Sequence, residues 1–212
     1  MNAKVAVLQQ QRPRLAPAPA GGDAWRHWSA ATISGIWGAP IENVRVQWPL
    51  VYSELAMRGY GDRPPCIAAI ATIGVEAGTF WPVREGWWLS DAARVAYLTR
   101  MYEGRADLGN TQPGDGARYG GAGLIQLSGR ANYRTYGQAI GIDLEAHPER
   151  ALEPAVSAAV FGEYFRRHRT VQGYGIPDAA RAGDWRMTRI LVNGGTNGWD
   201  DYISYVRALE AA

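Results

Sequence analysis

The sequence has a single cysteine and no long apolar run. Because Cys66 stands alone, an internal disulfide and a cysteine-based metal cluster are both excluded. Its apolar neighbours predict a buried structural thiol rather than a nucleophile. No stretch is long and apolar enough to cross a membrane, and residues 1–14 lack the apolar segment of a secretory signal. We therefore expect that the protein is synthesised in a cytoplasm and does not insert into a membrane.

The chain also lacks a strong net charge and a histidine cluster. Its formal net charge of +2 is too small for the dense basic stripe that binds nucleic acid, but it is compatible with an acidic polymer. His27, His147 and His168 are scattered without metal-ligand spacing, so neither a metal nor a cofactor is expected. A Gly-x-Ser-x-Gly segment is absent too, which leaves little support for a Ser-His-Asp hydrolase or a zinc amidase.

Phenylalanine is scarce, with three residues, whereas the chain has nine tryptophans and eleven tyrosines. Aromatic rings with a polar edge suit surfaces that are dry on one side and wet on the other. Sugar-binding sites need such surfaces, because pyranose rings stack on indole faces. Most of these aromatics are expected in the core, and Trp81 and Tyr119 are the candidates for binding substrate.

The chain is expected to form one domain, residues 23–212, after a leader at residues 1–22. The leader is rich in Gln, Arg, Ala and Pro, which predicts disorder, although a short arm that contacts a partner is the alternative. No internal repeat is visible, and a monomer is expected.

Apolar spacing and capping residues predict a mainly α fold with a small β element. Asn43 is expected to cap a helix that runs to Met57, with Pro49 breaking or kinking it. A glycine-rich loop spans 104–123, and alternation at 124–128 predicts a short strand. The other predicted helices are 64–78, 91–101, 130–140, 154–168, 184–193 and 199–210.

The carboxylate of greatest interest is Glu76, near the end of the segment at 64–78. This segment is apolar nearly all round, as in a buried helix, and Phe80 and Trp81 follow it. A carboxyl group in such surroundings is costly to ionise, so it can keep a proton near neutral pH and give it to a glycosidic oxygen. The alternative is that Glu76 extends into water, because glutamate is almost never buried unpaired.

Glycoside hydrolysis usually needs a second carboxylate, and Glu103 is the first candidate. It lies where a predicted helix meets the glycine-rich loop, and a loop carboxylate can face the first one across a cleft. Glu85 and Asp115 are rivals for this role. The alternative for Glu103 is a local ion pair with Arg105 or Arg100.

Two long segments carry a family resemblance. They are Tyr-Glu-Gly-Arg-Ala-Asp-Leu-Gly-Asn-Thr-Gln-Pro-Gly-Asp-Gly at 102–116 and Gly-Leu-Ile-Gln-Leu-Ser-Gly-Arg-Ala-Asn-Tyr at 123–133. Together with shorter matches at 75–78 and 193–198, they resemble glycoside hydrolase family 19, in particular the endolysins of bacteriophages.

The resemblance implies a lysozyme-like helical fold of two lobes with a central cleft. It also implies an inverting cut of β-1,4 links in chitin or, in the phage branch, in peptidoglycan, with Glu76 as general acid and Glu103 as general base. Gln126 and Ser128 would share one face of the predicted strand. The residues implied to bind substrate in the cleft are Gln126, Ser128, Asn132 and Asn193.

A structural alternative stands beside each of these four residues. Each could be a buried polar group satisfied by backbone, and the glycines after Asn193 also fit a plain helix C-terminus. Family arginines are missing in two places: many relatives have a basic Arg-Gly-Arg-Gly run where this chain reads Gly-Gly-Ala-Gly at 120–123, and Tyr202 stands where relatives often place an arginine that connects the catalytic carboxylates. The candidates to compensate for these losses are Arg118, Arg130 and Arg207.

These observations predict an endolysin that hydrolyses peptidoglycan, is made in a bacterial host cytoplasm and acts on the cell wall after release. Three alternatives stay open. They are a chitinase, a lytic transglycosylase that uses one acid and leaves a 1,6-anhydro sugar, and a non-catalytic protein of the same fold that binds cell walls or belongs to a virion.

Overall fold

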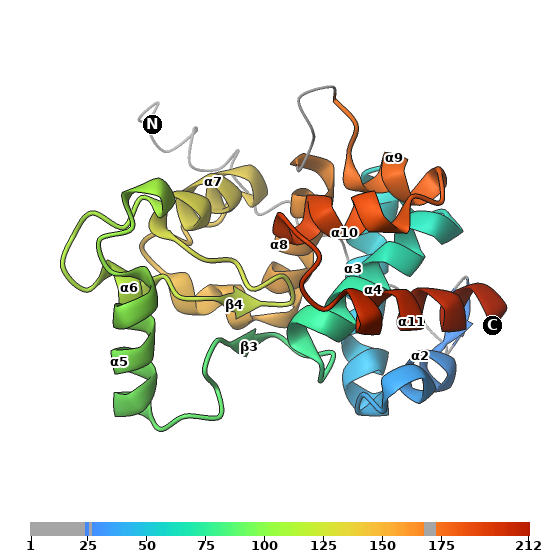
Figure 1. Ribbon diagram of the computed structural model, residues 1–212, viewed down its shortest axis with the longest axis horizontal. Coiled ribbons are helices and arrows are strands. Elements are labelled where there is room, and N and C mark those ends of the chain that lie inside the picture. The colour runs from blue at the N-terminus through green and yellow to red at the C-terminus, as the bar shows by residue number, and fades with distance from the viewer. Residues whose placement is uncertain (1–23, 26, 168–172) are drawn as a thin grey trace, which may run out of the picture.

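The computed structural model describes residues 24–25, 27–167 and 173–212, so the predicted leader at 1–22 lies outside the described residues. The described chain is mainly helical, as predicted (Figure 1). Among its residues, no helix combines the length and apolarity needed to span a bilayer. In chain order the elements are β1 (Ala24–Trp25), β2 (Trp28–Ser29), α2 (Ala30–Trp37), α3 (Ile41–Met57), α4 (Arg63–Ala77), β3 (Val83–Arg84), α5 (Asp91–Tyr102), η1 (Ala106–Leu108), α6 (Asp115–Arg118), β4 (Ala122–Gly123), α7 (Arg130–Ile140), η2 (Pro148–Leu152), α8 (Pro154–Arg167), α9 (Ile176–Arg181), α10 (Trp185–Asn193) and α11 (Trp199–Ala211).

One lobe is built around α4, the apolar helix that the sequence predicts. Pro64 and Pro65 lie in its first turn, where proline removes no helical hydrogen bond. α9, α10 and α11 pack against α4, and α2 and α3 complete the lobe on the right of Figure 1. α4 is buried along most of its length. Its one carboxylate, Glu76, lies in the last turn, where the helix comes near the surface.

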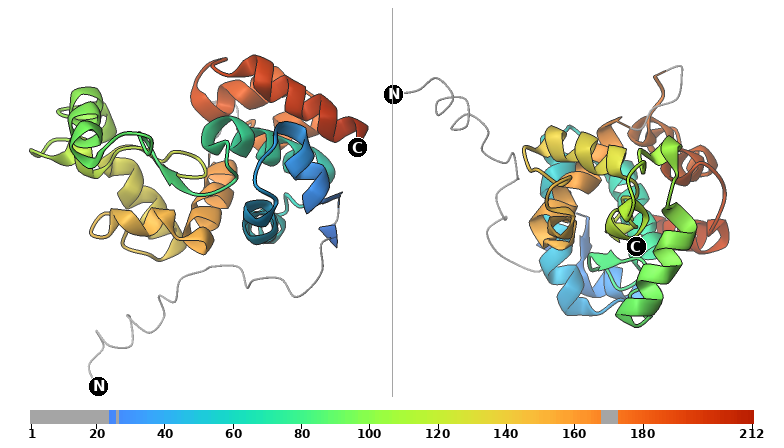
Figure 2. Two further views of the ribbon diagram at one scale, coloured as in Figure 1. Left: turned by 90° about the horizontal axis from the view of Figure 1, so that it is seen from below. Right: turned by 90° about the vertical axis from the view of Figure 1, so that its left-hand side faces the viewer.

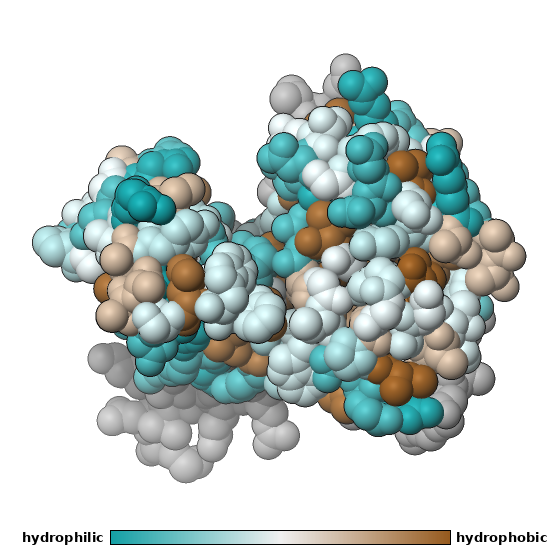
Figure 3. Space-filling view, turned by 60° about the horizontal axis from the view of Figure 1, so that its bottom comes forward, coloured by the Kyte–Doolittle hydropathy of each residue, from teal (hydrophilic) through white to brown (hydrophobic). Residues whose placement is uncertain are grey.

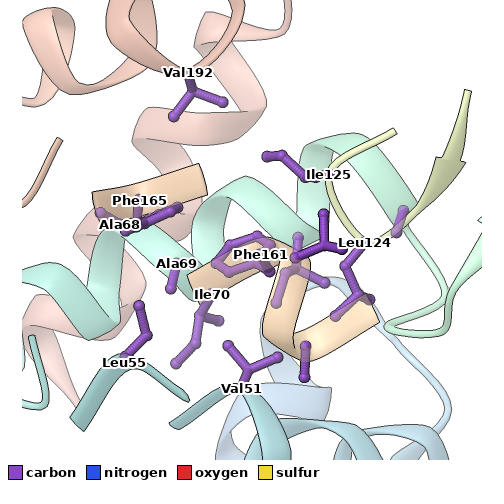
Figure 4. Close-up of a cluster of buried hydrophobic side chains, with 14 of the residues drawn as sticks. Val51, Leu55, Ala68, Ala69, Ile70, Leu124, Ile125, Phe161, Phe165 and Val192 are labelled. Atoms are coloured by element: carbon purple, nitrogen blue, oxygen red, sulfur yellow. The ribbon is translucent and has the colours of Figure 1, made fainter. Parts of the chain in front are cut away.

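The main core lies where α3, α4 and α8 meet. Figure 4 shows apolar side chains converging from these helices and from the loop after β4. Two buried carboxylates, Glu54 on α3 and Glu163 on α8, lie at the α3–α8 interface, and Arg58 donates hydrogen bonds to both. The labelled side chains are Val51, Leu55, Ala68, Ala69, Ile70, Leu124, Ile125, Phe161, Phe165 and Val192.

The second lobe contains α5, α6, α7 and the two-stranded sheet of β3 and β4, and Figure 1 and the left view of Figure 2 both separate it from the first. In this sheet, Val83 pairs with Gly123 and Arg84 with Ala122, antiparallel. Figure 3 shows the surface hollowed between the two lobes. The expected two-lobed architecture is therefore present.

The strand predicted at 124–128 is wrong. β4 ends at Gly123, and the next residues form a tight loop in which the Leu127 N–H donates to the Ala122 carbonyl at 2.9 Å. Leu124, Ile125 and Leu127 are all buried, so their spacing around Gln126 does not reflect a strand with one wet face.

The predicted helices form, with ends shifted by a few residues. α3 begins at Ile41, and Asn43 does not cap it, because the Asn43 side chain donates to the Thr79 carbonyl at 2.8 Å. Pro49 lies inside α3 without ending it. Four further short helical segments, η1, α6, η2 and α9, were not expected from the sequence.

Candidate active site

A cleft of about 270 Å³ opens between the lobes. Residues from both lobes line it: the end of α4 and the end of α10 on one side, and η1, the loop after β4 and α7 on the other. The lining residues are Glu76, Leu108, Ile125, Gln126, Leu127, Ser128, Asn132, Tyr136, Tyr164, Val192 and Asn193.

The two carboxylate oxygens of Glu76 differ in their hydrogen bonding. Its side chain is 21% exposed, and Oε1 accepts a hydrogen bond from Arg189 Nη1 at 2.7 Å. Among the described residues, Oε2 has no hydrogen-bond partner. The surroundings of Glu76 thus differ from the apolar, aromatic pocket expected from the sequence, because a guanidinium lies against the carboxylate.

The chain direction after Glu76 is fixed by tight local structure. α4 ends at Gly78 with a positive φ of 44°, and Phe80, fully buried, also has a positive φ of 56°. Phe80 stacks on Trp37 at 5.9 Å between ring centroids, and Trp37 Nε1 donates to the Gly78 carbonyl at 2.6 Å. These contacts hold the last turn of α4, and with it the Glu76 backbone, against α2.

Arg189 is the functional residue that the sequence did not reveal. Only 2% of it is exposed, and its Nε and Nη2 donate to the Asn197 carbonyl at 2.8 and 2.6 Å. Its Cζ lies 5.8 Å from the centroid of the Tyr202 ring. Arg189 on α10 therefore supplies the positive charge that is missing at position 202, and its guanidinium packs on the ring of Tyr202. The sequence did contain a sign that Arg189 is buried, since Arg189 shares a helical face with the apolar residues Trp185 and Val192.

The three arginines considered as replacements lie elsewhere. Arg118 donates to the carbonyls of Glu145 and Ala146, and Arg130 binds the carboxylates of Asp115 and Glu145. Arg207 is exposed on α11. Since these contacts stabilise the second lobe, neither Arg118 nor Arg130 holds Glu76.

Gln126, Ser128 and Asn132 all line the cleft, although no strand carries them. Gln126 Nε2 donates to the carbonyls of Gly123 and Val83 at 2.8 and 3.1 Å. Ser128 Oγ donates to the Gln126 carbonyl at 3.0 Å, and Asn132 Nδ2 to the Ser128 carbonyl at 2.7 Å. The amide nitrogens of Gln126 and Asn132 are thus used to fix the loop, which leaves their amide oxygens as acceptors.

Asn193 combines the two roles considered for it. It is the last residue of α10, followed by Gly194 with a φ of 77°, and it lines the cleft. Its Nδ2 donates to the Asn197 carbonyl at 3.2 Å, and its Oδ1 accepts from the Gly195 N–H at 3.0 Å. Asn193 and Arg189 therefore share the Asn197 carbonyl.

Tyr119 does not bind substrate, and its assignment is corrected. Its side chain is 1% exposed, its hydroxyl donates to the Glu145 carbonyl at 2.9 Å, and its ring packs edge-on against Tyr133. Trp81 is half-buried and outside the described lining of the cleft, so its role stays a prediction. The cleft has other aromatic walls, Tyr136 and Tyr164, stacked at 5.8 Å between ring centroids.

Glu103 holds a loop together instead of pairing with Arg105 or Arg100. Its Oε1 accepts from the Gly114 N–H at 2.7 Å and its Oε2 from the Gly116 N–H at 2.8 Å. Both groups belong to the start of α6, a position that favours a carboxylate. Asp115 also stabilises this region, because it accepts from the N–H groups of Thr111 and Gln112.

Glu85 lies beside Gln126, one of the residues that line the cleft. Its Oε1 accepts from the Tyr97 hydroxyl at 3.0 Å, and its Oε2 from the Tyr102 hydroxyl at 2.8 Å and the Gly121 N–H at 3.0 Å. A methyl group on Gly121 would lie 2.7 Å from Glu85 Oε2 and 2.9 Å from Gln126 Oε1, so both side chains border the same point. Burial first, and then the bond to Glu85, raise the pKa of Tyr102 to about 12, which keeps that hydroxyl a donor.

The comparisons with known proteins bear on this geometry. No family model matches the chain. A protein of Haemophilus influenzae described as a glycosyl hydrolase family 19 domain-containing protein is 31% identical over 111 residues, 52% of this chain and 50% of that protein. The chain thus spans half the length of this curated relative.

Two solved structures superimpose on most of the molecule. Chitinase C from Streptomyces griseus has a TM-score of 0.61 at 20% identity, covering 94% of this chain and 84% of that one. A bacterial family 19 chitinase has a TM-score of 0.57 at 20% identity, covering 85% and 94%. The chain has the fold of the family 19 chitinases. The fold that the resemblance at residues 102–133 implied is thereby confirmed.

Proposed function

We propose that this chain is a glycoside hydrolase that cuts β-1,4 links in a polysaccharide of N-acetylated sugars. The observation that supports this most is the arrangement around Glu76. A carboxyl group with one oxygen held by a buried arginine and the other open lies in a cleft lined by amides, a hydroxyl and aromatic rings. A second carboxylate, Glu85, lies beside Gln126 of the same cleft.

Glu76 is the proposed general acid. The protonated carboxyl gives its proton from Oε2 to the oxygen of the leaving sugar as the glycosidic bond breaks and an oxocarbenium-like transition state forms. Arg189, hydrogen-bonded to Oε1, then stabilises the carboxylate that remains. The aromatic walls and the amide oxygens of Gln126 and Asn132 hold the sugar rings in place.

For the general base, the structure favours Glu85 over Glu103. An ionised carboxylate has about four lone-pair sites, and three of those on Glu85 accept hydrogen bonds. The fourth is left for a water, whose proton Glu85 takes as the water attacks the sugar on the face opposite Glu76. Glu103 serves the α6 turn, because its two oxygens accept from the N–H groups of Gly114 and Gly116.

We propose peptidoglycan as the polymer and release from a lysing host as the setting, in line with the resemblance to phage endolysins. The small positive net charge suits an acidic wall polymer. Chitin is the second candidate, because both solved neighbours are described as chitinases.

The test is to incubate the purified chain with peptidoglycan and with chitin and to measure new reducing ends and product masses. We expect hydrolysed products from peptidoglycan in excess over chitin. Faster cutting of chitin would reverse the substrate choice. Products lighter by one water would identify a lytic transglycosylase, and binding without any new reducing ends would identify a non-catalytic protein.

A further inference from the structure

Two adjacent tryptophans are unusually exposed. Trp87 and Trp88 are 58% and 65% exposed, the highest fractions among the large apolar residues described, whereas Trp28 and Trp48 are 4% and 1% exposed. Their ring centroids are 6.1 Å apart, and the ring planes meet at 84°. Exposed indoles cost free energy in water, and such a pair usually marks a binding surface.

The fold holds these indoles outward. The Trp87 N–H donates to the Arg84 carbonyl at 3.1 Å and the Leu89 N–H to the Gly86 carbonyl at 2.9 Å, so two successive turns fix the segment. Gly86 has a φ of 71°, and a side chain at this position would point at Arg94 and Tyr97 of α5. The exposed position is therefore a property of an ordered turn, anchored on one side by β3 and on the other by α5.

The turn is joined closely to the site by the chain. Trp87 and Trp88 follow Glu85 by two and three residues, and Glu85 borders Gln126 of the cleft. A cleft of about 270 Å³ has room for about one sugar ring with its substituents. A polysaccharide cut there must continue past the cleft, and the turn that follows Glu85 offers an aromatic surface for its further sugars.

We propose that Trp87 and Trp88 form an outer binding site for the polysaccharide, in which pyranose rings stack on the indole faces. The inference rests on the proposed function. The neighbours Arg84, Ser90 and Asp91 are exposed and polar, so the indoles stand in a polar rim. That combination fits a sugar, which has an apolar face edged by hydroxyl groups, better than it fits a broad apolar surface.

The test compares Trp87→Ala, Trp88→Ala and the double variant with wild type on polymer and on a short oligosaccharide of the same sugars. We expect the double variant to raise KM for the polymer about tenfold or more and to leave kcat and short-substrate turnover unchanged. Met57→Ala is the matched control, because Met57 is 55% exposed at the far end of α3. Unchanged KM for the polymer in the double variant would overturn the proposal.

A binding assay separates this proposal from the catalytic one. Sedimentation with insoluble peptidoglycan or chitin measures polymer binding even where no bond is cut. If wild type binds and the double variant does not, the outer site stands whether or not hydrolysis occurs. A wild-type dimer that becomes a monomer in the double variant would show instead that a second copy covers the indoles, and adsorption to phospholipid vesicles that the double variant loses would show a membrane surface. Either result overturns the proposal.

Discussion

At the scale of single residues, the two candidates for the second carboxylate differ in what they hold. Glu85 borders Gln126 at the cleft, whereas Glu103 accepts two backbone N–H groups at the start of α6. We predict that Glu85→Gln lowers kcat by about 100-fold or more, the usual effect of losing a general base. Glu103→Gln should keep kcat within a few-fold and lower the melting temperature, because an amide nitrogen cannot accept from an N–H.

Steady-state kinetics and thermal melts of the two variants check this pair of outcomes. They form a matched comparison, since each removes one negative charge and keeps the side-chain shape. The reverse pattern, with activity lost in the Glu103 variant and kept in the Glu85 variant, would restore Glu103 as the base.

Arg189 gives a second prediction at this scale. Arg189→Met removes the donor to Glu76 Oε1 and both donors to the Asn197 carbonyl. We expect a loss of about 2–3 kcal/mol in the free energy of unfolding and a fall in kcat with little change in KM. Denaturant melts and kinetics measure the two effects.

Tyr202→Phe is the control for Arg189. Within the part of the chain that the structure describes, the Tyr202 hydroxyl is buried without a hydrogen-bond partner. Its removal should therefore leave stability and activity close to those of wild type, while the ring still packs on the guanidinium. If Arg189→Met retains full kcat, the role of Arg189 is confined to the fold.

At the scale of elements, the pairing of β3 with β4 brings Glu85, just after β3, close to Gly121, just before β4. Gly121 has no positive φ, so alanine suits its backbone, but the added methyl would meet Glu85 Oε2 and Gln126 Oε1 at 2.7 and 2.9 Å. Both atoms are at the ends of side chains that can move. We therefore predict that Gly121→Ala lowers kcat more than tenfold and shifts the melting temperature little.

Gly35→Ala is the matched control for Gly121→Ala. Apart from the backbone of α2 itself and the adjoining residues, no atom of the described residues lies within 4 Å of the added methyl, so stability should rise slightly, by about 1 kcal/mol or less, and kcat should not change. Kinetics and melts of both variants test the account, and wild-type activity in Gly121→Ala would show that Glu85 and Gln126 need not approach each other.

The α3–α8 interface predicts how stability depends on pH. Burial opposes the ionisation of Glu163, but hydrogen bonds from Arg166 and Arg167 outweigh it and lower the pKa of this carboxyl to about 2. A carboxyl whose pKa is lower in the folded than in the unfolded state stabilises the fold above its unfolded pKa, about 4.3. That contribution is lost as the pH falls toward 2.

We therefore predict that Glu163→Gln lowers the free energy of unfolding by about 3 kcal/mol at pH 7 and by progressively less from about pH 4.5 downward. Urea unfolding at pH 7, 5, 4 and 3 measures the difference. Glu42→Gln, which removes an exposed pair with Arg45, should shift stability by less than about 1 kcal/mol at every pH. A Glu163 effect that stays constant down to pH 3 would contradict the assignment.

At the scale of the whole molecule, the sequence predicts the helices well and the site in part. α4 was predicted because its apolar residues run nearly all round, a pattern that only a buried helix shows. The resemblance at 102–133 led to Gln126, Ser128 and Asn132, and the cleft contains them. Glu76 was found because it is the one carboxylate at the end of an apolar helix.

The parts that the sequence did not predict depend on contacts between distant residues. Arg189 meets Glu76 across 113 positions, and no local pattern encodes such a pair. The strand predicted at 124–128 failed because three buried leucine and isoleucine side chains mimic alternation in a tight loop. Tyr119 was misassigned because an aromatic ring with a polar edge serves a core hydrogen bond as readily as a sugar.

The central claim is that the proton of Glu76 breaks the glycosidic bond, and Glu76→Gln tests it most directly. The glutamine oxygen can still accept from Arg189, so the melting temperature should stay close to that of wild type. Release of reducing ends from the polymer that wild type cuts should fall by at least about 100-fold. A folded Glu76→Gln variant that releases reducing ends at the wild-type rate would contradict the account.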